Sequence, residues 1–301
     1  MLIFSFSPFG YEGALVTVEV DLRRGIPAVD IVGLADGAVK ESRERMQAAI
    51  RNSCFEFPNE RVLISLSPAD LKKEGAGFDL PIALSVILSN VPKSVSEKFI
   101  TDAVLVMGEL ELSGKVRSIK GVHAAISTAV ANGITRCIVP SGNLDEALEV
   151  EGALVYGANS LADAFSALSD VNVFKEKKLD VKNKDDVEFA DLGNAYRFED
   201  IKGQFKLVRG LQIAAAGGHN VLALGAPGCG KTMAMQKFPG INPLLSMDES
   251  QSVTRIWSLA GLIKPNEPLI RVPPFRMPHQ TATIEGICGG GVDVRPGEIS
   301  L

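Results

Sequence analysis

The feature that most constrains the fold of this chain is a glycine-rich loop that follows a predicted strand and precedes a predicted helix. The loop fits the pattern G-x-x-x-x-G-K-[ST] and reads Gly225-Ala226-Pro227-Gly228-Cys229-Gly230-Lys231-Thr232. The apolar run 220–224 before it is typical of a buried strand, and a helix is expected to begin at Lys231. In such a context, successive backbone N–H groups point into one anion-binding nest at a helix N-terminus. The second half of the chain is therefore predicted to bind the phosphates of a nucleotide.

Each residue type in the loop suits this chemistry. Gly228 and Gly230 allow the backbone to curl, and Lys231 is expected to place its charge on the β- and γ-phosphates of ATP. The Thr232 hydroxyl is expected to ligate the Mg²⁺ that accompanies ATP or ADP, because Mg²⁺ prefers oxygen ligands. Cys229 is interpreted as a small residue that the loop tolerates, in preference to a redox switch. All eight loop residues are assigned to the nucleotide site, and no residue is assigned a catalytic role.

Length, charge and cysteine usage limit the remaining possibilities. The 301 residues correspond to about two domains of roughly 150 residues. A net charge of −5 lacks the footprint of a dedicated nucleic-acid binder, although it leaves room for a local basic face. The four cysteines form no C-x-x-C pair, which favours a reducing cytoplasm, and they are Cys54, Cys137, Cys229 and Cys288. Neither a signal peptide nor a membrane-length apolar run is found, so we expect a cytoplasmic protein without a membrane partner.

Periodicity in the first half predicts a mixed α/β unit. Strands are expected at 14–21, 26–32, 61–66, 103–107, 115–119, 137–140 and 153–156. Helices are expected from 39 to a stop at Asn52-Ser53, and at 79–88, 122–131 and 161–168. In the first helix, one face is apolar at Val39, Met46, Ala49 and Ile50, while a second set is expected to stay solvated, namely Lys40, Glu41, Arg43, Glu44 and Arg45.

A charged stretch with little periodicity separates the two halves, so an interdomain linker is predicted there. The expected organisation is a first domain at 1–169, a linker at 170–199 and a second domain at 200–301. The second domain is expected to open with a helix at 204–216, before the strand and the loop.

Several segments have the form of a known family's motifs, namely 198–204, 214–220, 275–281, Gly289-Gly290-Gly291 through Arg295-Pro296-Gly297-Glu298-Ile299-Ser300-Leu301, 32–45 and 73–83. Through these segments the chain resembles the magnesium-chelatase-like AAA+ ATPases of the ComM/YifB group over nearly its whole length. Two positions depart from the family, because Gln280 stands where a histidine is usual and Cys229 where Ser or Thr is common.

This resemblance implies an ATP-binding protein whose full-length form is a hexameric ring that moves DNA, for example in branch migration during competence. It also implies that Ile201 contacts the adenine. The family continues into a Walker B strand, sensor residues and an arginine finger, which are expected to follow Leu301 in a longer chain. A truncated reading frame and a fragment of a longer protein both remain open, and so does ATP hydrolysis by this chain.

The first half is also similar to the proteolytic domain of Lon, which uses a Ser-Lys pair. Where a Lon-type protease carries its serine, this chain reads Lys73-Glu74-Gly75-Ala76-Gly77, and where the lysine belongs it reads Lys120-Gly121-Val122-His123. We therefore expect a Lon-like α+β scaffold without peptidase activity, followed by an incomplete P-loop AAA+ domain.

Two other functions are considered beside the DNA motor. One is a partner in magnesium insertion into a porphyrin, which the Lon-like half disfavours. The other is a nucleotide-binding module that does not hydrolyse ATP. Among the histidines, His123 is predicted to be packed or solvated and His219 to lie in a turn, while for the loop around Arg276 and His279 a DNA-facing and a structural role are both open.

Overall fold

The computed structural model describes residues 2–10, 12–73, 75–92, 99, 102–177, 187–290 and 296–301. Its contacts divide the chain into two compact units. Unit 1 comprises Met1–Leu179, Thr254–Leu269 and Ala282–Leu301, whereas unit 2 comprises Asp180–Val253 and Ile270–Thr281. The domain boundaries at 170 and 200 stay predictions. Glu74, the linker segment 178–186 and the signature segment 291–295 lie outside the described residues.

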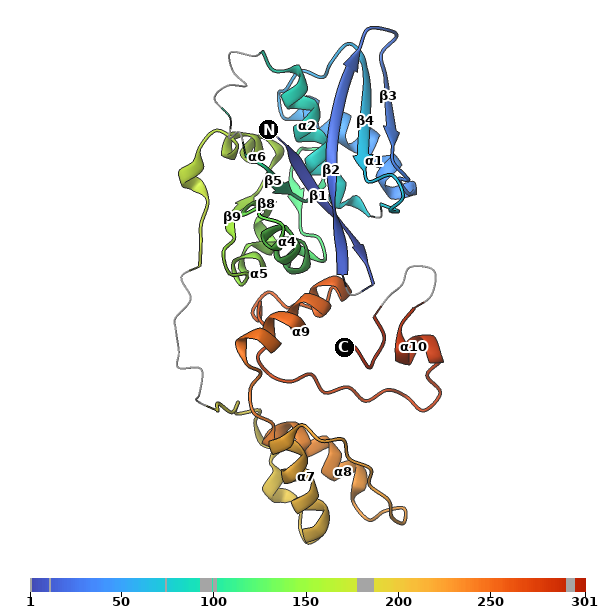
Figure 1. The fold of residues 1–301 in the computed structure, drawn as a ribbon, viewed down its shortest axis with the longest axis vertical. Coiled ribbons are helices and arrows are strands. Elements are labelled where there is room, and N and C mark those ends of the chain that lie inside the picture. Colours follow the sequence, from blue (N-terminus) through green and yellow to red (C-terminus); the bar gives the residue numbers. More distant parts are fainter. Residues whose placement is uncertain are drawn as a thin grey trace. The chain divides into compact units, whose positions relative to one another are not determined.

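Unit 1 is built on a seven-stranded sheet whose order is β3-β4-β2-β1-β5-β8-β9 (Figure 1). Strand β2 is antiparallel to β1 and β4, while the pairs β3-β4, β1-β5, β5-β8 and β8-β9 are parallel. A separate antiparallel ribbon joins β6 and β7. The strands are β1 (Ile3–Phe9), β2 (Glu12–Arg23), β3 (Ala28–Val32), β4 (Arg61–Ser67), β5 (Val104–Val106), β6 (Glu109–Leu110), β7 (Val116–Arg117), β8 (Arg136–Pro140) and β9 (Leu154–Ala158).

Helices pack on both faces of this sheet. In β5, Val104 and Val106 join the core that contains α1, α2 and α6, whereas Leu105 joins the core that contains α4 and α5. A strand buried on both faces is apolar at every position, as this one is. The helices of unit 1 are α1 (Gly37–Asn52), α2 (Asp79–Asn90), α4 (Val122–Ala131), α5 (Leu144–Leu148), α6 (Leu161–Ala167) and α10 (Ile284–Cys288). The predicted mixed α/β fold is confirmed.

Part of the predicted linker lies against the sheet. Lys175 and Val155 of β9 exchange two backbone hydrogen bonds of 2.8 Å, just after a 3-10 turn at Val171–Val173. These bonds cover the otherwise unpaired edge of β9. The segment from 171 to 175 is thus part of unit 1, although it falls within the predicted linker.

Unit 2 is helical in its described residues, with α7 (Phe205–Gly217), α8 (Lys231–Lys237) and the first residues of α9 (Met247–Ala260). Its small core consists of Ile201, Leu211 and Ala234. The predicted strand at 220–224 is wrong, because this segment forms no strand and Leu222 and Leu224 are 83 % and 86 % exposed. An extended segment becomes a strand only when a neighbour takes up its hydrogen bonds, and no described residue does so here. None of the described helices has the length and apolar character that crossing a membrane requires.

Candidate functional site

The glycine-rich loop leads directly into α8. Gly228 and Gly230 have φ values of +79° and +88°, in the left-handed region that glycine adopts without strain. Gly230 is also the N-cap residue of α8. A Cβ atom added at Gly228 would meet no atom within 4 Å, so the backbone there faces open space. The chain curls at the two positions where the pattern places glycine.

Free N–H groups gather along this curl. The backbone N–H groups of Gly228, Cys229 and Gly230 donate to no other described residue. The N–H groups in the first turn of a helix also lack intrahelical acceptors, and α8 starts at Lys231. A row of unpaired donors at a helix start suits an anion such as phosphate. These backbone groups therefore fit the predicted nucleotide.

Lys231 folds back over the loop that precedes it. Its Nζ donates to the carbonyl oxygens of Gly225 at 2.7 Å and Ala226 at 2.8 Å, and lies 3.5 Å from Sγ of Cys229. The Gln204 Nε2 donates to the Cys229 carbonyl at 3.2 Å. The loop thus holds the ammonium group of Lys231 beside its own unpaired N–H groups.

The remaining predicted site residues differ in exposure. Pro227 and Thr232 are exposed, so the Thr232 hydroxyl is accessible at the first turn of α8. Ile201 is only 8 % exposed and packs with Leu211 and Ala234 in the core of unit 2. The described part of the chain contains no group of three or more His, Cys, Asp or Glu residues that could hold a metal ion. The Mg²⁺ prediction therefore depends on Thr232 together with a nucleotide.

The segments 32–45 and 73–83, which carry the family resemblance in the first half of the chain, contact each other in unit 1. Asp36 caps α1 by accepting from the N–H of Val39 at 2.8 Å, and it also accepts from the N–H of Gly75 at 3.3 Å. The Lys73 N–H donates to the Leu34 carbonyl at 3.2 Å, and the Asp36 N–H donates to the Lys73 carbonyl at 3.1 Å. The Lys73 side chain is fully buried, with its Nζ donating to the carbonyl of Pro68, and burial lowers the pKa of its ammonium group.

A buried ion pair between Arg45 and Asp79 also joins the segments 32–45 and 73–83. Asp79 has no exposed surface and accepts from Arg45 Nε at 2.8 Å and Arg45 Nη2 at 3.1 Å. It also accepts from the Ser42 hydroxyl and from the Leu110 N–H at 3.2 Å. The prediction that Arg45 is solvated is wrong, since its side chain is 25 % exposed and its hydrogen bond to Asp79 raises the pKa of its guanidinium. These residues stabilise the fold.

The structure also brings together the two segments where a Lon-type protease carries its Ser and Lys. A Cβ atom added at Gly77 would lie 3.4 Å from Cδ1 of Ile119. Neither Ala76 nor Gly77 carries a hydroxyl, and the Lys120 side chain lies against Gly261. These residues therefore form no Ser-Lys pair.

His123 is packed, as predicted, and lies fully buried on α4. Its backbone N–H donates to Glu146 Oε1 at 3.1 Å and to Ser258 Oγ at 3.2 Å. Glu146 also accepts from the Ser258 hydroxyl and from Asn143 Nδ2 at 3.2 Å. The sequence reading missed this cluster, although Gly121 at the start of α4 offers no side-chain cap and so signals that a partner must come from elsewhere.

The remaining predicted candidates are Arg276, two histidines and the cysteines. Arg276 and His279 are exposed, and His279 Nδ1 lies 2.7 Å from Thr281 Oγ1. His219 follows the left-handed C-cap Gly218 of α7. None of the four cysteines, all of which the structure describes, forms a disulfide.

Comparison with known proteins identifies the family. The model of the family described as "Subunit ChlI of Mg-chelatase" matches residues 18–143, and that described as "Magnesium chelatase, subunit ChlI" matches 197–301. An uncharacterized protein of Mycobacterium tuberculosis is 38 % identical over 298 residues, covering 99 % of this chain and 57 % of the relative.

Two named relatives match the whole chain. YifB of Escherichia coli is 35 % identical over 302 residues, covering 100 % of this chain and 57 % of its own length. The competence protein ComM of Haemophilus influenzae is 34 % identical over 307 residues, covering 100 % of this chain and 58 % of its own length. The chain thus spans little more than half the length of these relatives.

A shorter similarity concerns the fold. The archaeal Lon protease of Methanocaldococcus jannaschii is 23 % identical over 141 residues, which cover 47 % of this chain and 21 % of that protein. It agrees with the mixed, mostly parallel sheet of unit 1. With both halves matched by chelatase family models and the full length matched by YifB and ComM, the chain belongs to the magnesium-chelatase-like ComM/YifB family.

Proposed function

We propose that the chain binds ATP and ADP, together with Mg²⁺, at the loop 225–232, as the nucleotide-binding part of an AAA+ motor. One observation carries this proposal: the loop holds the ammonium group of Lys231 next to a curl of unpaired backbone N–H groups at the start of α8. Fixed donors and a fixed positive charge in one small loop suit a phosphate chain.

In this proposal each residue has a distinct part. The N–H groups of Gly228, Cys229 and Gly230 donate to phosphate oxygens, and Lys231 leaves the loop carbonyls to contact the terminal phosphates. Bound Mg²⁺ supplies positive charge that neutralises the phosphates, with the Thr232 hydroxyl as its protein ligand. Ile201 fixes the segment before α7 against the core of unit 2 and presents its exposed edge to the adenine.

For the longer protein, we propose a cytoplasmic ring of identical subunits that moves DNA through its AAA+ part. Membership of the ComM/YifB family supports this, and the relative ComM is named a competence protein. Cysteines that form no disulfide among the described residues agree with a reducing compartment.

The nucleotide site is tested by the substitution Lys231→Ala, with isothermal calorimetry of MgATP and MgADP binding. We expect wild-type protein to bind both nucleotides and the variant to lose at least ~10-fold in affinity, because a charge-assisted hydrogen bond to phosphate disappears. The matched control is Lys264→Ala, which removes a lysine whose side chain is 72 % exposed and is expected to leave the affinity unchanged. Equal affinities for wild type and Lys231→Ala would refute the assignment.

A partner role in magnesium insertion is the second candidate, since both matching family models carry the magnesium-chelatase description. ATP turnover by the longer protein distinguishes the candidates. Stimulation by forked or junction DNA supports the motor, dependence on protoporphyrin supports the chelatase partner, and nucleotide binding without turnover supports a non-hydrolysing module.

A further inference from the structure

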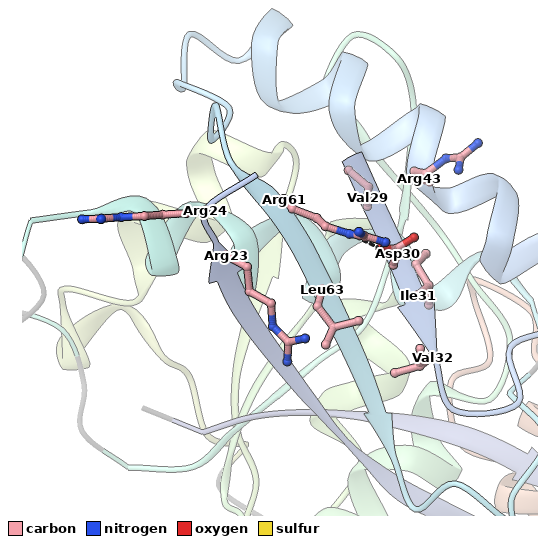
Figure 2. Close-up of a pocket in the computed structure, with 9 residues that line it drawn as sticks. All are labelled: Arg23, Arg24, Val29, Asp30, Ile31, Val32, Arg43, Arg61 and Leu63. Atoms are coloured by element: carbon pink, nitrogen blue, oxygen red, sulfur yellow. Dashed lines mark hydrogen bonds and ion pairs between the residues drawn. The ribbon is translucent and has the colours of Figure 1, made fainter. Parts of the chain in front are cut away.

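Unit 1 carries an arginine-lined groove where β2, β4 and the edge strand β3 meet (Figure 2). The groove has a volume of about 830 Å³. Four of the nine lining residues are arginines, and the single lining carboxylate is Asp30. The arginines are Arg23, Arg24, Arg43 and Arg61. The lining is therefore positive in a chain whose net charge is −5.

Two of these arginines repel each other by their placement in the sheet. Arg23 of β2 and Arg61 of β4 are direct cross-strand partners, an arrangement in which like charges destabilise a sheet. Their ion pairs are exposed: Arg23 Nε lies 2.6 Å from Asp21, and Arg61 Nη2 lies 2.7 Å from Asp30. Exposed ion pairs are weak, so an anion can replace the carboxylates. An anionic ligand over both guanidinium groups relieves the repulsion.

The spacing of the arginines fits a chain of phosphates better than one compact phosphate. In Figure 2, Arg24 and Arg43 extend outward from opposite ends of the groove, and Arg23 and Arg61 lie between them. Leu63 lines the floor, and no aromatic residue lines the groove. The polar contacts that the described lining offers a nucleic acid are mainly guanidinium groups, which suit the sugar-phosphate backbone.

Acidic residues limit the direction in which a chain of phosphates can lie across the groove. Glu19 and Asp21 lie on the same face of β2 as Arg23, since side chains two residues apart share a face of the strand. A polyanion that ran along β2 would meet both carboxylates. The favourable path instead crosses the strands, from Arg24 over Arg23 and Arg61 towards Arg43.

We propose that this groove binds the phosphodiester backbone of DNA without sequence preference. The site is separate from the loop 225–232, and it goes beyond the proposed function, which assigns DNA contacts to the AAA+ part. Its contacts are guanidinium-to-phosphate pairs, so its affinity falls with rising salt.

The test measures binding of fluorescent oligo(dT) to the full chain by anisotropy at several salt concentrations. The double substitution R23Q/R61Q is expected to weaken binding by at least ~10-fold and to lower the salt slope by ~0.7 for each lost phosphate contact. Asp30→Asn frees Arg61 of its carboxylate and is expected to strengthen binding, which no folding defect would do.

The matched control is Arg117→Gln. Arg117 is 61 % exposed and ion-paired with Glu111 at 2.8 Å, much as Arg23 is 60 % exposed and paired with Asp21. Its loss removes one positive charge outside the groove, as the single substitution Arg23→Gln does inside it, and is expected to leave DNA affinity unchanged. Equal weakening by Arg117→Gln and Arg23→Gln would show that only overall charge matters, and would overturn the proposal.

Two further measurements distinguish DNA binding at this groove from binding of a free phosphorylated ligand and from binding at the loop 225–232. Tripolyphosphate that binds to the groove when oligo(dT) does not would identify a free phosphorylated ligand and overturn DNA binding. Lys231→Ala is expected to leave oligo(dT) affinity intact, and R23Q/R61Q to leave MgATP affinity intact. If the protein binds oligo(dT) at the groove but does not bind MgATP, only the proposed function is contradicted. If it binds MgATP but oligo(dT) does not bind at the groove, only the groove proposal is contradicted.

Discussion

Asp79 is a fully buried carboxylate of unit 1 that serves as acceptor for three polar groups. Its carboxylate accepts from Arg45, Ser42 and the Leu110 N–H while having no exposed surface. Removing one member of a buried ion pair is costly because the other charge remains in a poorly solvated site.

We therefore expect Asp79→Asn to lower the free energy of unfolding by ~3 kcal/mol, measured by urea denaturation. The matched control is Glu267→Gln, because Glu267 is 44 % exposed and pairs with Lys264 at 3.5 Å. The control is expected to change stability by less than ~1 kcal/mol. Similar losses for both variants would contradict the structural role of Asp79.

The positions of the loop residues could be predicted from the sequence, whereas the contacts of Asp79 could not. The positions of Gly228, Gly230 and Lys231 follow from a local pattern, because the loop and the helix that it begins are neighbours in sequence. The Arg45–Asp79 pair instead depends on how α1 packs against α2, and a charged residue on a helix surface gives no local sign of such a distant partner.

Among the elements, the second part of α9 is attached to unit 1 through polar contacts. The Gly121 N–H donates to the Ser258 carbonyl at 3.0 Å, and the Ser258 hydroxyl donates to Glu146. Ser258 is 1 % exposed, so water does not replace these bonds.

Ser258→Ala should loosen this attachment, since it removes a donor from buried Glu146 and an acceptor from the His123 N–H. An unsatisfied buried group costs ~1–3 kcal/mol. Faster hydrogen exchange is expected in the segment Thr254–Leu269, with unchanged exchange in β2. Ser252→Ala is the control, because that hydroxyl lies on an exposed position of the same helix and bonds only to the Asp248 carbonyl. Unchanged exchange in Ser258→Ala would show that apolar packing alone holds the segment.

Helices and strands were predicted correctly where one face of the element is buried. The predictions failed where strand formation depends on hydrogen bonding to a neighbouring strand. Alternation identified β2, and helical spacing identified α1, whose residues Val39, Met46 and Ile50 are fully buried. Strand β1 was not among the predicted strands, and it forms because β2 and β5 pair with it on both sides. The segment 220–224 has an apolar pattern but no described neighbour to pair with, so its pattern alone did not make it a strand.

At the scale of the whole molecule, the two units differ in the size of their cores. The core of unit 2 is the small cluster of Ile201, Leu211 and Ala234, whereas unit 1 has two large cores on either side of its sheet. Stability from apolar burial scales with the area removed from water. We therefore expect unit 2 to unfold at a lower urea concentration than unit 1.

Two probes separate these transitions. Trp257 is the single tryptophan and belongs to unit 1, so its fluorescence reports that unit, while circular dichroism reports the helices of both. On the proposed function, MgATP at ~100 times its Kd stabilises unit 2 by ~2.7 kcal/mol and shifts the earlier transition only. Coincident transitions, or a shift confined to Trp257 fluorescence, would contradict this expectation.

The hydrogen bonds of Lys231 to the Gly225 and Ala226 carbonyls show that the loop itself supplies acceptors for the ammonium group. An arriving nucleotide enters an exchange, in which phosphate oxygens must outcompete two carbonyl oxygens for one ammonium group. Ionised acceptors form stronger hydrogen bonds than neutral ones, so a ligand wins this exchange by the negative charge that it brings within reach of Lys231. On the proposed function, the loop thereby sets a threshold on ligand charge, and we expect a nucleoside triphosphate to pass it and a nucleoside without phosphates to fail.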